Sequence, residues 1–244
     1  MTSTKTPPLA GRIALITGAS RGLGRAAALE LAKAGAHILA LARTQGGLEE
    51  LDDEIRKVGG SCSLITADLA DLNGIDRLGG VVAERWGKLD ILIGNAAMLG
   101  SISPTPQIDP KLFEQTIALN LTANWRLIRS FDPLLRASDA GRLIFVTSGA
   151  AKSRNAFWSA YAASKSALEA LVESYAKEIA HSNVRVNLLD PGPVATAMRA
   201  KAMPGEDPAT LPTPANLAPL FLELSLPSCQ RQMEIVKFSD WVNR

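Results

Sequence analysis

The stretch Thr17-Gly18-Ala19-Ser20-Arg21-Gly22-Leu23-Gly24 decides the fold of this chain. It follows an apolar run at residues 13–16 and leads into a segment rich in Ala and Leu. Glycines at this spacing permit a tight turn and let backbone N–H groups approach a pyrophosphate at the helix N-terminus. The stretch lacks the Gly-Lys-Ser/Thr ending of a P-loop, which disfavours nucleoside triphosphate hydrolysis. A strand, a glycine turn and a helix in this order predict a dinucleotide-binding site.

Short apolar runs recur along the chain, and most of them are separated by segments long enough for a helix. They lie at residues 13–16, 38–41, 64–65, 91–93, 143–146, 184–189 and 235–236. Runs that are apolar on both faces and separated by helices are typical of a parallel sheet covered on both sides. We therefore predict an α/β fold with a doubly wound, mostly seven-stranded parallel sheet, Rossmann-like, in a single domain over residues 1–244.

Composition limits the partners of the chain. With 244 residues, 47% hydrophobic and 20% charged, it can bury a large core, and a net charge of +2 gives no broad field for nucleic acid or membrane. Cys62 and Cys229 are too few for a disulfide framework, and no cysteine or histidine cluster offers a metal site. Residues 1–10 lack the apolar core of a signal peptide. We expect a soluble, cytoplasmic protein.

A composition shift marks residues 191–227, which hold eight of the 14 prolines. We interpret this region as a substrate lid over the carboxyl edge of the sheet, with a short helix at residues 216–224. An irregular surface connection is the alternative. Apolar side chains in and near the lid, Met198, Met203, Phe157 and Trp158, suit a largely apolar substrate or, alternatively, packing within the protein.

A second motif lies beyond the middle of the chain. Tyr161 and Lys165 are four residues apart on a predicted helix, so both side chains can reach one site. A tyrosine hydroxyl titrates near ~10, and a neighbouring ammonium would lower that pKa toward the range of an acid–base catalyst. Ser148 follows the apolar run at 143–147 and can hydrogen-bond a carbonyl oxygen. The three residues predict a proton-transfer site.

The end of the second apolar run bears on the choice of cofactor. Dinucleotide folds that prefer NAD place Asp or Glu there, but this chain has Ala42 followed by Arg43. Arg21 lies at the start of a helix, where a cation is unfavourable unless an anion compensates it. A 2′-phosphate would compensate both arginines. We predict NADP(H) over NAD(H); two solvated surface charges are the alternative.

With these motifs in order, the chain resembles the short-chain dehydrogenase/reductase family from about residue 10 to 200. The resemblance rests on Thr-Gly-x-x-x-Gly-x-Gly at 17–24, on Tyr-x-x-x-Lys at 161–165, and on Ser148. It implies that Tyr161 is the acid/base, Lys165 its electrostatic partner and a ribose ligand, and Ser148 the group that polarises the substrate. Asn120 would hold a proton-relay water.

The resemblance also implies a set of cofactor contacts. Asp68 corresponds to a residue that contacts adenine in the family, with a helix N-cap as the alternative reading. Thr196 would bind the nicotinamide carboxamide. The residues expected to bind the cofactor are Gly18, Ser20, Arg21, Gly22, Leu23, Gly24, Arg43, Asp68, Leu69, Asn95, Lys165, Pro191, Gly192 and Thr196.

The chain departs from the family pattern in two places. Where the family usually has Asn-Asn-Ala-Gly, this chain has Gly94, Asn95, Ala96 and Ala97, which removes one bracing side chain and adds a methyl near the cofactor. Residues 234–244 lack the glycine-rich ending common in the family.

These observations predict an NADP(H)-dependent oxidoreductase that acts on a small carbonyl or alcohol, with 3-oxoacyl compounds among the candidate substrates. A non-catalytic regulator that binds the dinucleotide and a methyltransferase are the alternatives, and neither requires the Tyr-x-x-x-Lys pair. By analogy with the family, helices around residues 111–135 and 153–180 would form a homodimer or homotetramer.

Overall fold

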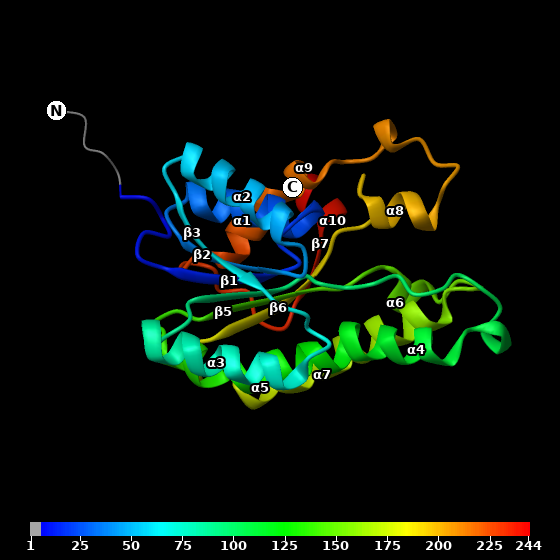
Figure 1. Ribbon diagram of the computed structural model, residues 1–244, viewed down its shortest axis with the longest axis horizontal. Coiled ribbons are helices and arrows are strands. Elements are labelled where there is room, and N and C mark those ends of the chain that lie inside the picture. The colour runs from blue at the N-terminus through cyan, green and yellow to red at the C-terminus, as the bar shows by residue number, and fades with distance from the viewer. Residues whose placement is uncertain (1–5) are drawn as a thin grey trace.

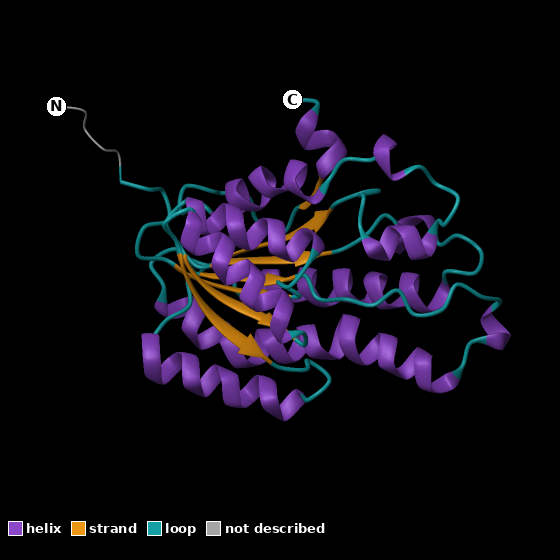
Figure 2. Cartoon of the chain, turned by 45° about the horizontal axis from the view of Figure 1, so that its top comes forward, coloured by secondary structure: helices purple, strands orange, loops and turns teal. Residues whose placement is uncertain are grey.

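Seven parallel strands form one sheet in a computed structural model that describes residues 6–244 (Figures 1 and 2). Residues 1–5, part of the stretch for which no signal peptide is predicted, lie outside the described residues. The strands are β1 (Ile13–Thr17), β2 (His37–Ala42), β3 (Ser61–Thr66), β4 (Ile91–Gly94), β5 (Arg142–Val146), β6 (Arg185–Asp190) and β7 (Ile235–Lys237).

The strand order is β3-β2-β1-β4-β5-β6-β7, so the direction of winding reverses between β1 and β4. A crevice opens at such a reversal, beyond the carboxyl ends of the two strands, and ligands of open α/β sheets bind there. The predicted doubly wound, single-domain Rossmann-like fold is confirmed.

Helices cover both faces of the sheet (Figure 1). Alternate strand residues face opposite layers: Ile16 belongs to the hydrophobic cluster under α1, and Leu15 to the cluster under α5. One layer contains α1 (Gly22–Lys33), α2 (Gln45–Lys57), α9 (Pro214–Ser225) and α10 (Phe238–Val242). The other contains α3 (Leu72–Trp86), α5 (Ala123–Ala137) and α7 (Ser159–Glu178).

Strand β3 is longer than the apolar pattern predicts. Residues 64–65 are its only long aliphatic pair, but it begins at Ser61 and pairs with β2 along its whole length. As an edge strand it is only half buried, and the hydroxyls of Ser61 and Ser63 bond the ring of His37 on β2. Polar residues can therefore occupy an edge strand without an apolar signature.

The predicted helix over residues 111–135 is interrupted. It consists of α4 (Pro110–Ile117), a π-helical turn at Ala118–Thr122, and α5. Asn124 donates a hydrogen bond of 2.8 Å to the backbone oxygen of Asn120 within this turn. Short π-helical turns are often found at functional sites, and this one carries a residue that the sequence assigns to the site.

Residues 191–227, expected as a lid, have two different environments. The first part carries α8 (Ala197–Ala202) and a short 3-10 helix at Pro208–Thr210. The second part forms α9, which contains the predicted helix 216–224. Its Leu217, Leu220 and Phe221 are fully buried in the helix layer that also contains α1. The α9 part of this region therefore belongs to the core, and a lid role for the part before it stays a prediction.

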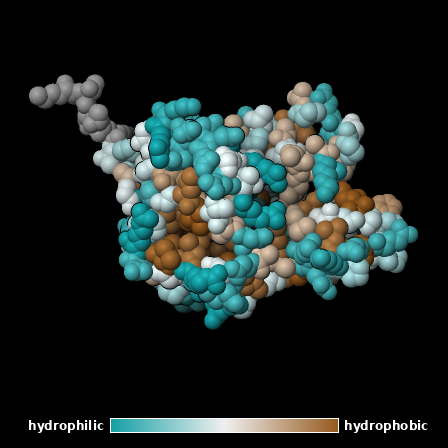
Figure 3. All heavy atoms as spheres, in the orientation of Figure 1, coloured by the Kyte–Doolittle hydropathy of each residue, from teal (hydrophilic) through white to brown (hydrophobic). Residues whose placement is uncertain are grey.

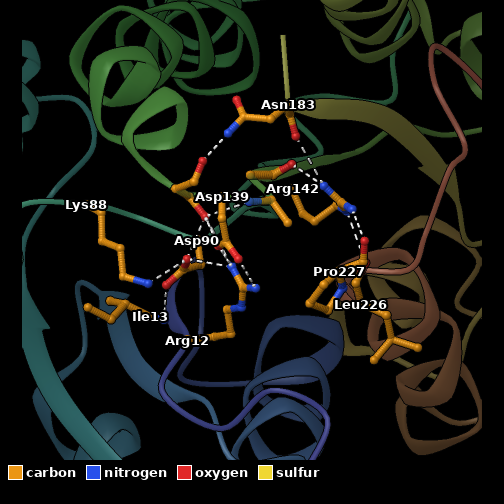
Figure 4. A network of polar contacts seen from close by, with 12 residues as sticks. Arg12, Ile13, Lys88, Asp90, Asp139, Arg142, Asn183, Leu226 and Pro227 are labelled. Atoms are coloured by element: carbon orange, nitrogen blue, oxygen red, sulfur yellow. Dashed lines mark hydrogen bonds and ion pairs between the residues drawn. The ribbon is translucent and has the colours of Figure 1, made fainter.

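A polar network joins the amino ends of three strands, opposite the carboxyl edge (Figure 4). Asp90, directly before β4, is fully buried and accepts hydrogen bonds from Arg12 at 2.9 Å, Lys88 at 3.0 Å and Ser138 at 2.6 Å. Its other oxygen accepts from the backbone N–H of Ile13 at 2.9 Å. One carboxylate therefore connects the starts of β1 and β4 to the loop before β5.

Candidate active site

A cavity of about 820 Å³ lies at the carboxyl edge of the sheet, a size that suits a small-molecule or cofactor site. Two predicted site residues, Gly24 and Asn120, are not among its lining. The predicted residues that do line it are Gly18, Ser20, Arg21, Gly22, Leu23, Arg43, Asp68, Leu69, Asn95, Ser148, Tyr161, Lys165, Pro191, Gly192 and Thr196.

The glycine turn has the backbone that its sequence requires. Gly18 and Gly22 have φ angles of +67° and +57°, where residues with a Cβ are strained. A Cβ on Gly22 would meet nothing closer than Thr196 Cγ2 at 3.8 Å, so this part of the turn is open to a ligand. Gly24 serves packing instead, because a Cβ there would lie 2.4 Å from the Gly18 carbonyl oxygen. The turn can therefore cradle a pyrophosphate at the start of α1.

Asn95 and Thr17 join the two strands at the winding reversal. The Thr17 hydroxyl accepts hydrogen bonds from the backbone N–H groups of Asn95 and Ala96, both at 3.0 Å. In return, Asn95 Nδ2 donates to the Thr17 carbonyl oxygen at 2.9 Å. These bonds hold the ends of β1 and β4 together next to the cavity, and Ala97 lines the cavity directly after them.

The lack of a side chain at Gly94 is matched by a bulky side chain on the neighbouring strand. A Cβ on Gly94 would lie 2.1 Å from Cδ1 of Phe145 and 2.9 Å from Oδ1 of Asn124. Phe145 is fully buried on the neighbouring strand β5, in register with Gly94. Its ring therefore occupies the space into which a larger residue at 94 would project.

Gly94→Ala is expected to destabilise the protein by about 1–3 kcal/mol, because the added methyl overpacks a buried ring. In the Phe145→Leu background the same change should cost less, because the smaller side chain leaves room for it. Urea unfolding of the two single variants and the double variant measures the coupling. Strictly additive effects would contradict direct contact between the two positions.

Tyr161 and Lys165 lie one turn apart on α7, and both side chains are buried. The Lys165 ammonium donates a hydrogen bond of 2.8 Å to the Val146 carbonyl oxygen and lies 5.8 Å from the centre of the Tyr161 ring. Ser148 comes from the loop after β5, lines the same cavity, and its hydroxyl acts to lower the pKa of the Tyr161 phenol. The structure thus brings the three predicted residues together in one cavity.

The protonation of this group differs from the sequence expectation. Burial raises the pKa of Tyr161 to about 12, which outweighs the opposing effect of the Ser148 hydrogen bond. Burial also lowers the pKa of Lys165 to about 8, although the Glu169 carboxylate acts in the opposite direction. In the unliganded protein burial therefore opposes ionisation of both side chains, and the phenol is neutral at neutral pH.

Asn120 lies behind the cavity wall, fully buried in the π-helical turn. Its side chain accepts a hydrogen bond from Met98 N and donates to Met98 O, both at 2.9 Å. It also donates to the Ser164 hydroxyl at 3.0 Å. The Asn120 side chain thus braces the loop after β4 against α7, and its predicted hold on a relay water stays a prediction.

The two arginines predicted to contact a 2′-phosphate line the same end of the cavity. Arg21 is the N-cap residue of α1, and Arg43 directly follows β2, with its side chain 69% exposed. Arg43 Nη1 lies 3.9 Å from Asp68 Oδ2, the limit of a loose ion pair. Asp68 accepts from the Ala70 N–H at 2.9 Å, whereas the N-cap of α3 is Asp71, which does not support the N-cap reading of Asp68.

The α8 region lines the cavity from the opposite side. Thr196 is the N-cap of α8 and accepts a hydrogen bond of 3.2 Å from the Arg199 N–H. The Arg199 guanidinium bonds both oxygens of Glu206, so its charge is already paired. Ile102 and Met203, which are not among the residues lining the cavity, are more than a third exposed, and Figure 3 shows apolar surface between α8 and the segments of α4 and α6 (Ala150–Ser153).

Asp190 is a residue of this site that sequence analysis did not identify. At the end of β6, it accepts hydrogen bonds of 3.1 Å from the backbone N–H groups of Gly149 and Gly192. Its charge also contributes to the raised pKa of Tyr161. The sequence contains a signal for this residue, because an acidic side chain at the end of a predicted strand stands directly before Pro191-Gly192.

Comparison with known proteins settles the family. The short chain dehydrogenase family matches residues 12–207, which is most of the chain. The chain belongs to the short-chain dehydrogenase/reductase family. It is therefore an oxidoreductase, and the resemblance noted from its motifs is confirmed.

Relatives agree in sequence and in structure. The chain is 37% identical over 216 residues to the uncharacterized oxidoreductase YciK of Escherichia coli K12, covering 87% of this chain and 85% of that protein. A short chain dehydrogenase of Shigella flexneri, complexed with NADP, has a TM-score of 0.91 at 34% identity over 96% of this chain and 99% of that one. Another from Escherichia coli CFT073, complexed with NADPH, has a TM-score of 0.89 at 35% identity, covering 96% and 98%.

Two further observations concern metal binding and membrane-spanning helices. Among residues 6–244, no group of three or more His, Cys, Asp or Glu side chains is arranged to hold a metal ion. Within the same residues, none of the helices has the length and apolar character needed to cross a membrane.

Proposed function

We propose that this short-chain dehydrogenase/reductase transfers a hydride between NADP(H) and a carbonyl or alcohol substrate. The observation that carries the proposal is the meeting of Ser148, Tyr161 and Lys165 in the cavity that begins at the glycine turn. A regulator that only binds the dinucleotide would have no use for a buried phenol and ammonium at the same place, and no observation favours it.

The nicotinamide, when bound, supplies the hydride for reduction or accepts it in oxidation. The glycine turn would hold the pyrophosphate, and Thr196 the carboxamide. In reduction, Ser148 donates a hydrogen bond to the carbonyl oxygen and Tyr161, neutral because of its burial, gives that oxygen its proton. Lys165 contacts the ribose and favours the phenolate that remains. In oxidation Tyr161 takes the proton back.

A preference for NADP(H) is part of this proposal. Arg21 and Arg43 line the cavity where the ribose of the adenosine would lie, and Ala42 takes the place of the acid that would repel a 2′-phosphate. No carboxylate within residues 6–244 forms an ion pair with Arg21. The relatives crystallised with NADP and NADPH are consistent with this choice.

Arg43→Asp is expected to lower the ratio of NADPH to NADH affinity by about 10–100-fold. The variant removes one charge-assisted hydrogen bond to the 2′-phosphate and places a repelling carboxylate beside it. Titration of both reduced cofactors by fluorescence measures the ratio. Lys57→Asp, the same change of charge at an exposed position at the end of α2, should leave the ratio unchanged. Equal or tighter NADH binding by the wild type would contradict the preference.

The substrate class follows from the lining of the cavity. Met98, Leu99, Trp158 and Met198 supply an apolar surface close to Tyr161. We therefore favour apolar carbonyl compounds, with 3-oxoacyl thioesters as one candidate group and the part of 191–227 before α9 as the lid. A screen of ketones, aldehydes and 3-oxoacyl thioesters for NADPH oxidation tests this. Turnover of none of them by protein that binds NADPH would contradict the proposal.

The proposal includes assembly and location. Phe113 on α4 and Trp125 on α5 are 40% and 43% exposed, on helices that the family uses for subunit contact, which supports a homodimer or homotetramer. Light scattering of the purified protein measures its mass in solution. Cys62 and Cys229 are both free thiols, in keeping with the cytoplasmic location expected from the sequence.

A further inference from the structure

A buried carboxylate on α7, Glu169, ties the chain on either side of Ser148, next to the bond of 2.9 Å from the Ser166 hydroxyl to the Ala151 carbonyl oxygen. Glu169 accepts a hydrogen bond of 2.7 Å from the hydroxyl of Thr147, the residue directly before Ser148. Its second oxygen lies 3.2 Å from the ammonium of Lys152, on α6 directly after the loop. Glu169 therefore holds the chain on both sides of Ser148.

The position of Glu169 in its helix is unusual for a charged residue. Its side chain is 7% exposed, and Leu168 and Val172 beside it on α7 belong to the hydrophobic core. Burying a carboxylate costs several kcal/mol unless partners compensate it, and an aliphatic residue would fill such a place without that cost. A charge retained on the buried side of a helix points to a role beyond packing.

The same side of α7 carries the proton-transfer residues. Tyr161, Lys165 and Glu169 follow one another at intervals of four residues, so they lie on neighbouring turns of one helix face. Lys165 reaches the end of β5 through the Val146 carbonyl oxygen, and Glu169 reaches the next residue, Thr147. Lys165 and Glu169, on successive turns of α7, thus bind two successive residues at the end of β5.

We propose that Glu169 is a positioning residue for the reaction: by holding Thr147 and Lys152, it fixes the Ser148 hydroxyl opposite the Tyr161 phenol. The role of Ser148 as the group that polarises the substrate rests on the proposed function. The placement of Ser148 and Tyr161 in one cavity does not, because it is a property of the unliganded protein.

Kinetics provide the first test. Glu169→Leu should lower kcat for a carbonyl substrate about 10–100-fold, because a misplaced Ser148 no longer meets the carbonyl oxygen. The KM for NADPH should change little. Thr147→Val, which removes the hydrogen bond to Glu169 with little change of shape, should also lower kcat. Thr147→Ser, which keeps a hydroxyl at this position, should have a kcat close to that of the wild type. Glu178→Gln, an exposed carboxylate on the same helix, should have no effect.

A spectroscopic test does not depend on turnover. The chain has only two tyrosines, so in the Tyr175→Phe background a ¹³C-labelled ring reports on Tyr161 alone. Its Cζ resonance responds to polar groups near the phenol oxygen, and Ser148→Ala gives the resonance position in the absence of the Ser148 hydroxyl. We expect Glu169→Leu and Thr147→Val to move the resonance toward this position, with Glu178→Gln unchanged from the wild type.

The outcomes separate the two proposals. If both variants keep the wild-type resonance and kcat while Tyr161→Phe abolishes turnover, Glu169 has no positioning role and the proposed function stands. If the resonance moves as expected but the wild type reduces no carbonyl, the positioning of Ser148 stands and the proposed function fails. If Glu169→Leu does not fold, Thr147→Val decides between these results.

Discussion

Tyr161→Phe is expected to lower kcat for carbonyl reduction by about 10²–10⁴-fold, the usual contribution of a positioned proton donor, while NADPH still binds. Phenylalanine keeps the ring and its edge-on contact with Trp158, whose ring centre lies 6.1 Å away. The Lys165 bond to Val146 does not involve the phenol and should persist. Steady-state kinetics and cofactor fluorescence measure the two effects separately.

Tyr175→Phe is the matched control. Tyr175 lies on the same helix, and its hydroxyl donates a hydrogen bond of 2.6 Å to Asp132 on α5. Its loss should reduce stability by about 1–3 kcal/mol, because a buried carboxylate bond is removed, but turnover should remain. Substantial residual turnover by Tyr161→Phe would show that another group supplies the proton.

The second large effect concerns stability. Asp90→Ala is expected to destabilise the protein by about 3–5 kcal/mol, because it removes the acceptor shared by Arg12, Lys88 and Ser138 in a fully buried position. For a chain of this size the melting temperature should fall by roughly 10 °C or more. Asp139→Ala removes a 75% exposed carboxylate from the same Arg12 and should cost about 0–1 kcal/mol. Similar losses for both variants would contradict the buried network.

The contribution of Asp90 should also depend on pH. Burial opposes its ionisation, but hydrogen bonds from Ser138 and the Ile13 N–H, together with the Lys88 ammonium, outweigh burial and hold the pKa of Asp90 below its usual value. The stabilisation is therefore complete above the pKa of an unfolded Asp, about 3.9, and is lost as the pH falls through the folded pKa. Melting curves of wild type and Asp90→Asn should converge in that acid range.

The fold could be predicted because its strands are buried on both faces. Most central strands show a continuous apolar run, although Asn187 interrupts that of β6, and the glycine turn fixes the direction of the first βα unit. Strand β3 was predicted too short because its first three residues, Ser61 to Ser63, include no aliphatic residue. The π-helical turn within the helix over 111–135 was not predicted, because the apolar spacing does not distinguish it from an α-helix.

The site could be predicted as far as its residues form linear motifs. Tyr161, Lys165 and Ser148 were identified by spacing and order along the chain. The lowered pKa of Tyr161 that the neighbouring ammonium led us to expect is not found in the unliganded protein, because burial, which depends on the packed structure, raises it. Likewise, the match between Gly94 and Phe145 and the ties formed by Glu169 join distant segments, which no spacing reveals.

The location of Asp90 and its partners has a practical consequence for protein engineering. The cavity lies at the carboxyl ends of the strands, whereas this network lies at their amino ends, with the full length of the sheet between them. The contribution of this network to thermal resistance can thus be changed without contact with the reacting groups. Libraries that seek heat-tolerant variants can vary the loops around Arg12 and Ser138 and leave the reacting groups untouched.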